Sequence, residues 1–163
     1  MMDRRVIRTH GPWQQMRAGF AWQIPAFFNI AVACCDSWAA AEPSRVALTD
    51  VTTEGDRDWT YGGLKDASDR LATVFAEEGL QRGDRVAVLL SQSAEVPVVH
   101  FAAQKLGAVV LPLFTLFGEE ALLYRLADSG AKIAVTDADS LPKLLKIRAQ
   151  LPDLTSVFST EAD

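Results

Sequence analysis

The chain has 163 residues, about the length of one globular domain, so it can bury a hydrophobic core. Hydrophobic residues make up 49% and charged residues 23%, which excludes a disordered chain because disorder requires low hydrophobicity and high charge. The net charge is −5 and the pI is about 5.0, which argues against a nucleic-acid partner.

The amino-terminal region carries no sign of a secretory signal, because polar residues and prolines interrupt the window that would need an apolar core. No segment has the length and hydrophobicity of a membrane span, so we expect a cytoplasmic protein. The only basic cluster, MMDRRVIR, is interpreted as a solvated tail. The adjacent Cys34 and Cys35 suit neither an ordinary disulfide nor a CxxC site, and are interpreted as packing residues.

The first sixty residues predict a helix followed by a β-hairpin. The helix covers residues 27–41 and ends before Pro43. Two β-like runs then flank the polar turn TTEGDRD, which contains Gly55. The tryptophans of this region are predicted to be packing anchors: Trp13, Trp22, Trp38 and Trp59. The helical stripe predicted to face the core is Ile30, Cys34, Trp38 and Ala41.

From residue 60 onward, helical and strand patterns alternate. Thr60 is a predicted N-cap, and glycines at 79, 107 and 130 are predicted to end three successive helices. The buried side of the first of these helices is predicted to carry Leu64, Ala67, Leu71, Val74 and Phe75. The predicted strands are VAVLL, VVLPL, KIAVTD and TSVFS. The fold class is therefore α/β, a mostly parallel sheet flanked by helices on both faces and preceded by a helix and a β-hairpin.

Residues with obvious chemistry are few. The sequence contains neither G-x-G-x-x-G nor G-x-x-x-x-G-K-[ST], and no G-x-S-x-G nucleophile motif. Gly62 and Gly63 lie at a helix start that could face an anion, but tight packing is the preferred interpretation. His10 and His100 are far apart and have no cysteine nearby, so we expect no metal site and no catalytic residue.

Three aspartates end or flank predicted strands, where α/β proteins often place binding carboxylates. Turn formation and helix capping explain the same positions equally well, so both interpretations remain open. These residues are Asp50, Asp84 and Asp137.

Four motifs occur together and in order: T-Y-x-x-L opening a helix, G-D-R-V-A-V, K-L-G-A-V-x-x-P-L, and F-x-x-F-G-x-E-A-L-x-Y-R-L-x-D-S-G-A-K. In this combination the chain resembles the amino-terminal part of the AMP-forming acyl-CoA synthetases, from about residue 20 to residue 160. The last motif is similar to the acetyl- and medium-chain types. The resemblance implies an extension over residues 1–25 and an incomplete large domain over residues 26–163.

The resemblance also implies a reaction. In this family a carboxylic acid and ATP give an acyl-adenylate and pyrophosphate, and CoA then displaces AMP, with Mg²⁺ assisting. This sequence lacks four features that the family uses for the reaction. They are the phosphate-binding Thr/Ser/Gly-rich loop ending in Pro-Lys, the Tyr-x-x-Thr-Glu motif, the ribose-binding Asp and the carboxy-terminal Lys. We therefore expect a scaffold fragment that is inactive and binds no cofactor alone. The alternative is a stand-alone truncated homologue that acts as a non-catalytic binding or partner-pairing module.

One loop lies close to the family's chemistry. The resemblance implies that Phe114, Phe117 and Gly118 line the CoA entrance, although core packing of the two phenylalanines is preferred. Acetyl-type enzymes hold the CoA nucleotide with an Arg/Gly-rich segment where this chain reads ADSLPKLL, and Lys143 could substitute in part. A fragment of a larger sheet exposes strand edges, so we also expect self-association.

Overall fold

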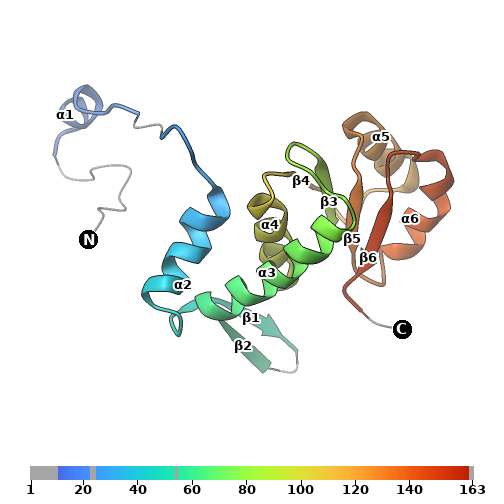
Figure 1. Ribbon diagram of the computed structural model, residues 1–163, viewed down its shortest axis with the longest axis horizontal. Coiled ribbons are helices and arrows are strands. Elements are labelled where there is room, and N and C mark those ends of the chain that lie inside the picture. Colours follow the sequence, from blue (N-terminus) through green and yellow to red (C-terminus); the bar gives the residue numbers. More distant parts are fainter. Residues whose placement is uncertain (1–10, 23–24, 54, 162–163) are drawn as a thin grey trace.

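A computed structural model describes residues 11–22, 25–53 and 55–161 of the chain. Figure 1 shows an α/β body that is preceded by a short helix, a longer helical segment and a β-hairpin. The short helix α1 covers Trp13–Ala18, and the longer segment consists of a π turn over Val32–Asp36 and α2 over Ser37–Ala41. Within the described residues, no helix is both long enough and apolar enough to cross a membrane.

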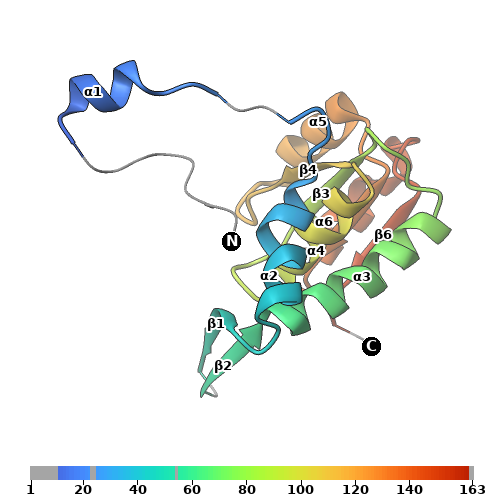
Figure 2. The same cartoon turned by 60° about the vertical axis from the view of Figure 1, so that its left-hand side comes forward.

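The predicted hairpin is present, with β1 at Val46–Thr52 and β2 at Gly55–Thr60 in antiparallel pairing. Its second strand begins at Gly55, so residues 55–58, which the sequence assigned to the turn, belong to the strand. Gly55 has a φ of 126°, a conformation that only glycine adopts without strain. Figure 2 shows the hairpin projecting from the body below the start of α3.

The helices and strands of the body follow the predicted order. The helices are α3 (Tyr61–Glu77), α4 (Glu95–Lys105), α5 (Glu119–Ser129) and α6 (Leu141–Ile147), the last continued by a 3₁₀ turn over Arg148–Gln150. The strands are β3 (Arg85–Leu89), β4 (Val109–Pro112), β5 (Ile133–Thr136) and β6 (Ser156–Ser159). All of them pair in parallel, in the order β4-β3-β5-β6.

The sheet separates two hydrophobic cores. On one face Val86 and Val88 of β3 pack with residues of α3 and α4, including Phe75 and Val99. On the other face Leu89 packs with residues of α5 and α6, and Figure 1 shows these helices on that side. Successive strand residues point to opposite faces, so strands buried on both faces require the continuous apolar runs that the sequence contains.

The start of α3 agrees with the sequence. The Thr60 hydroxyl accepts a hydrogen bond from the Gly63 N–H at 3.1 Å, which caps the helix. A Cβ on Gly62 would lie 2.9 Å from the Pro43 carbonyl oxygen, so Gly62 serves close packing, whereas a Cβ on Gly63 would make only an ordinary contact with the Thr60 hydroxyl oxygen at 3.5 Å. Of the positions predicted to face the core, Leu64 and Phe75 are buried, whereas Val74 is 37% exposed.

For the helix predicted over residues 27–41, which we call the first helix of the fold because α1 lies apart from the body, the residues predicted to face the core are wrong. The buried positions are Ala31, Cys35 and Ala39, while Cys34 is exposed and Ile30 is 48% exposed. Small residues face inward because this helix lies close to α3, where the Cys35 thiol contacts the Tyr61 carbonyl oxygen at 3.9 Å. Burial raises the pKa of the Cys35 thiol, so this group remains a protonated packing residue.

Hydrogen bonds and ion pairs hold this helix to α4. The Asn29 amide donates to the Gln104 carbonyl oxygen at 2.8 Å, and its oxygen accepts from the Ala31 N–H at 2.9 Å. The Lys105 ammonium lies 3.0 Å from an Asp36 carboxylate oxygen and also donates to Asp69 of α3. A residue near the start of the chain is thereby connected to the carboxyl end of α4.

Two of the four tryptophans do not pack as predicted. Trp38 stacks on Tyr61 at 5.7 Å between ring centroids and lies under the Arg45 guanidinium, and Trp59 is partly buried. Trp13 and Trp22, however, are 68% and 75% exposed. The prediction of packing anchors is therefore wrong for these two residues.

Candidate functional site

The carboxyl edge of the sheet is the part of this fold best placed for a ligand. From the end of β3 the chain turns into α4 on one face, whereas from the end of the adjacent β5 it turns into α6 on the other. This divergence is a topological switch point, and open α/β sheets commonly bind ligands outside the strand ends there. The loops that follow β3, β4, β5 and β6 all lie along this edge.

A surface pocket of about 340 Å³ lies at the switch point. Its lining comes from the loops after β3, β5 and β6, together with the start of α4. Carboxylates and hydroxyls predominate among the lining residues, which are Leu90, Ser91, Ser93, Glu95, Asp137, Asp139, Thr160 and Glu161. Four carboxylates give the pocket a negative charge that disfavours a phosphate group.

Asp137 connects two of these loops. One carboxylate oxygen accepts hydrogen bonds from the N–H and the hydroxyl of Ser91, at 3.0 and 2.9 Å, and the other accepts from the Ser140 N–H at 2.9 Å. Partial burial would raise the pKa of the Asp137 carboxyl, but these hydrogen bonds outweigh it and the pKa lies below its usual value. Asp137 thus performs the turn-forming role that the sequence left open.

Asp84 has a comparable structural role at the opposite, amino edge of the sheet. Its carboxylate accepts from the Lys132 ammonium and from the Gln81 N–H, both at 2.8 Å. The hydrogen bond from Lys132 is the main reason that the pKa of the Asp84 carboxyl lies below its usual value. Asp50 lies in β1, opposite Arg57 of β2. The three aspartates that the sequence singled out are therefore not gathered at one site.

The predicted entrance loop after β4 contains Phe114, Phe117 and Gly118, and the structure brings these three residues together at the carboxyl edge. The rings of Phe114 and Phe117 meet edge to face at 5.9 Å between centroids. Phe117 packs against the core, whereas Phe114 is 59% exposed. Gly118 is the residue before α5, and no atom lies within 4 Å of a Cβ built on it. Core packing therefore describes Phe117 and not Phe114.

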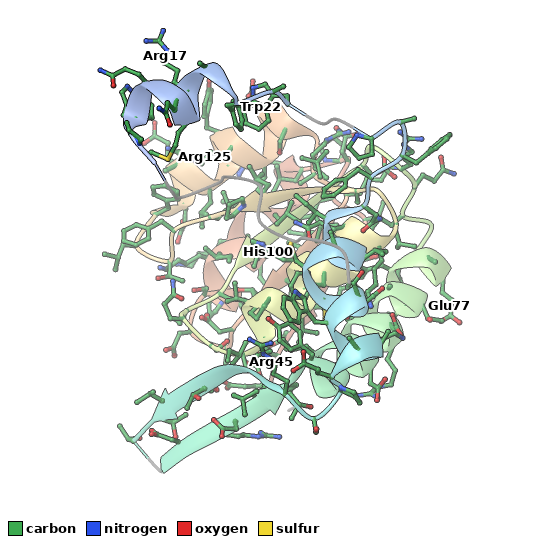
Figure 3. All side chains as sticks on the ribbon, turned by 90° about the vertical axis from the view of Figure 1, so that its left-hand side faces the viewer. Arg17, Trp22, Arg45, Glu77, His100 and Arg125 are labelled. Carbon is green, nitrogen blue, oxygen red and sulfur yellow. The ribbon has the colours of Figure 1, made fainter. Side chains whose placement is uncertain are left out.

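Two cations border this loop. The Arg125 guanidinium lies 4.1 Å from the centre of the Phe117 ring, and Figure 3 labels this residue on α5. The Lys143 ammonium donates to the Thr115 carbonyl oxygen at 2.7 Å, so it ties α6 to the loop. The sequence did not single out Arg125, because its contact with Phe117 depends on the path of α5 over the loop.

Of the two histidines, only His100 lies within the described residues, and His10 lies outside them. His100 is partly buried in α4. Burial lowers the pKa of the His100 imidazole, and its buried Nε2 has no hydrogen-bond partner within the described part of the chain. Within residues 11–22, 25–53 and 55–161, no group of three or more His, Cys, Asp or Glu side chains could hold a metal ion.

Comparison with known proteins identifies the family. A family model described as "AMP-binding enzyme" matches residues 35–163, most of the chain. The chain belongs to the AMP-binding enzyme family. It is similar to the mitochondrial acyl-coenzyme A synthetase ACSM4 of Rattus norvegicus, with 33% identity over an alignment of 138 residues that covers 80% of this chain and 24% of the relative.

Another relative in this family is the long-chain-fatty-acid–CoA ligase FadD13 of Mycobacterium tuberculosis, with 35% identity over 112 residues, 69% of this chain and 22% of the ligase. Among solved structures, an acyl-CoA synthetase of Brucella canis matches with a TM-score of 0.76 and 31% identity, covering 87% of this chain and 25% of that one. The amino-terminal domain of FACL13 from Mycobacterium tuberculosis matches with a TM-score of 0.73 and 30% identity, covering 82% and 34%. The chain thus spans about a quarter of the length of the curated relatives.

Proposed function

We propose that the chain forms the scaffold part of an ATP-dependent, AMP-forming acid–CoA ligase. In this reaction a carboxylate attacks the α-phosphate of ATP to give an acyl-adenylate and pyrophosphate, and the CoA thiol then displaces AMP. The match of residues 35–163 to the family carries the proposal, and relatives whose names specify acyl-CoA synthetases or ligases support it. The acids in question include fatty acids, since FadD13 is named for a long-chain fatty acid.

By itself the chain is proposed to be inactive. Phosphoryl chemistry requires cationic groups and Mg²⁺ against the phosphate oxygens. The sequence lacks the loop motifs that supply them in the family, and the pocket at the switch point is lined by four carboxylates. Among the described residues, no group of three or more His, Cys, Asp or Glu side chains is placed to hold a metal ion. ATP, Mg²⁺ and CoA are therefore ligands of the complete ligase.

The coding sequence beyond Asp163 tests this proposal most cheaply. A reading frame that continues into a Thr/Ser/Gly-rich loop followed by Pro-Lys supports the ligase scaffold. A natural stop codon, with a protein of 17.8 kDa detected in cells, contradicts it and favours the alternative, a stand-alone binding or partner-pairing module. Cell fractionation then distinguishes the proposed cytoplasmic location from the mitochondrial one that the name of the rat relative specifies.

We further propose that the loop after β4 forms part of the CoA entrance in the complete ligase. Phe117 fixes the loop to the core, which leaves Phe114 and Gly118 accessible to a passing ligand. Arg125 supplies positive charge beside the loop, whereas the pocket after β5 is acidic. These charges favour CoA phosphates near the Arg125 side of the edge rather than near Asp137 and Asp139.

A chimera tests the entrance loop. Residues 35–163 replace the matching part of FadD13, and the rate of acyl-CoA formation is measured. We expect Phe114→Ala to raise the KM for CoA and leave the KM for ATP unchanged. The matched control is Leu145→Ala on α6, which is 58% exposed and lies outside the loop. An unchanged KM for CoA in Phe114→Ala would exclude this loop from the CoA route.

Self-association is proposed for the isolated chain. Within the described sheet, β4 and β6 each have one unpaired edge, and unpaired edges readily accept a further strand. Sedimentation over a wide concentration range tests this proposal. A monomer at every concentration would contradict it.

A further inference from the structure

Four strongly exposed aromatic side chains lie before the α/β body, in a stretch that we call the amino-terminal aromatic segment, residues 11–22 and 25–28. Figures 1 and 2 both show α1 lying apart from the body, and α1 contains no buried residue. The exposed fractions are 68% for Trp13, 75% for Trp22, 94% for Phe27 and 66% for Phe28. Phe20 contacts only its neighbour Trp22 among the described ring pairs, at 4.9 Å between centroids. Water thus faces an unusually large aromatic area.

The net charge of the chain also changes sign after this segment. Residues 1–28 contain four arginines and one aspartate, a net charge of +3, whereas the whole chain carries −5. The remaining residues therefore carry −8. No carboxylate occurs between Asp3 and Asp36, although the chain contains 21 acidic residues. Figure 3 shows the Arg17 side chain projecting outward from α1, on the same segment as Trp22.

The exposed aromatic rings and the positive charge together indicate which kind of partner would bind this segment. Aromatic rings with arginines and without carboxylates suit the interface of an anionic bilayer, where rings enter the headgroup region and guanidinium groups meet phosphates. In a second copy of the chain residues 1–28 would also carry +3, and this like charge opposes self-pairing through the segment. An apolar protein groove would accept the rings but leave the absence of carboxylates unexplained.

We propose that the amino-terminal aromatic segment docks the protein on an anionic phospholipid surface. The negatively charged body is repelled by the same surface, so contact is made through this segment while the hairpin and the sheet remain in solution. Because the segment lies outside the pocket and the entrance loop, this inference goes beyond the proposed ligase function and does not depend on it.

Vesicle flotation with the full 163-residue chain tests the inference. We expect binding to phosphatidylcholine vesicles that contain phosphatidylglycerol to be at least about tenfold tighter than binding to phosphatidylcholine alone. Combining Trp13→Ala, Trp22→Ala and Phe27→Ala should weaken binding to the anionic vesicles by about tenfold or more. The matched control replaces three exposed apolar residues elsewhere by alanine: Val51, Tyr124 and Leu145.

A second pair of variants tests the charge. Arg17→Glu should weaken binding to the anionic vesicles, while Arg70→Glu on the exposed side of α3 should leave it close to that of the unaltered chain. Equal binding to neutral and anionic vesicles overturns the inference. So does unaltered binding by the triple aromatic variant, or a lipid-free dimer that this variant abolishes, because the segment would then be a protein interface.

Discussion

Removing the Lys105 ammonium should cost more stability than removing any surface lysine. The side chain is only 10% exposed and lies between Asp36 of the first helix and Asp69 of α3. Asp69 also pairs with Lys65 at 2.5 Å. Burial would raise the pKa of the Asp69 carboxyl, but the hydrogen bonds from Lys105 and Lys65 outweigh it and lower that pKa. Lys105→Met therefore removes the cation that the Asp36 and Asp69 carboxylates share, and leaves only the pair of Asp69 with Lys65.

The size of the expected stability loss follows from how deeply the two aspartates are buried. Removing one member of a fully buried ion pair costs about 3–5 kcal/mol. The Asp36 and Asp69 side chains are 22% and 43% exposed, so water recovers part of this energy and we expect a loss of about 2–3 kcal/mol. In Lys105→Met/Asp36→Asn the loss should be smaller than the sum of the two single losses by about 1 kcal/mol or more.

Urea denaturation monitored by circular dichroism measures these free energies of unfolding. The control is Lys146→Met, which removes an exposed pair with Glu119 at 2.8 Å and should change stability by less than about 0.5 kcal/mol. If Lys105→Met were as mild as Lys146→Met, or if the losses in the double variant were additive, the buried ion cluster would not hold the first helix to the body.

Two further predictions concern α3 and α4. Gly62→Ala should destabilise the protein by about 1–3 kcal/mol, because its Cβ would meet the Pro43 carbonyl oxygen. Gly63→Ala should be neutral or stabilising by up to about 1 kcal/mol. The same urea experiment compares the two variants, and a Gly62→Ala variant as stable as the unaltered chain would refute the close packing. Burial lowers the pKa of His100, so the unfolded chain takes up a proton first and stability falls as the pH decreases below about 6.5 toward the lower folded pKa. His100→Gln should flatten the decline in melting temperature between pH 7 and pH 5 relative to His10→Gln, and equal slopes for the two variants would exclude His100 as its source.

Local patterns predicted the elements of the body well. Thr60 caps α3, and Gly130 ends α5 in the left-handed conformation, with a φ of 57°. Both features depend on a few neighbouring residues, so the sequence shows them directly. The continuous apolar runs predicted the buried parallel strands β3 and β5 for the same reason, because a strand covered on both faces has no polar side. The prediction of a buried strand is wrong for β4, which lies at an edge of the sheet and exposes Val109 by 52%.

The face of the first helix depended on distant residues and was predicted incorrectly. A regular 3.6-residue repeat placed Ile30 and Cys34 inward, but a π turn occupies Val32–Asp36 and alters that repeat. Asn29 and Asp36 then bind the carboxyl end of α4, roughly seventy positions later in the chain. Residues 27–41 alone therefore could not predict which partners this helix contacts.

The candidate site was predictable in part. Phe114, Phe117 and Gly118 are close in sequence, so their common loop followed from the pattern alone. The pocket required the strand order, since it forms only where the loops after β3, β5 and β6 meet. The Arg125–Phe117 contact depends on how α5 returns over its own loop, which periodicity does not specify.

The central claim, that this chain is a ligase scaffold without its own adenylation machinery, is tested most directly by ATP–pyrophosphate exchange. The purified 163-residue chain is assayed with Mg²⁺, ATP, labelled pyrophosphate and a series of carboxylic acids from acetate to long-chain fatty acids. We predict no exchange above the rate without protein for any acid. Acid-dependent exchange by the purified chain, with formation of acyl-AMP, would contradict the account.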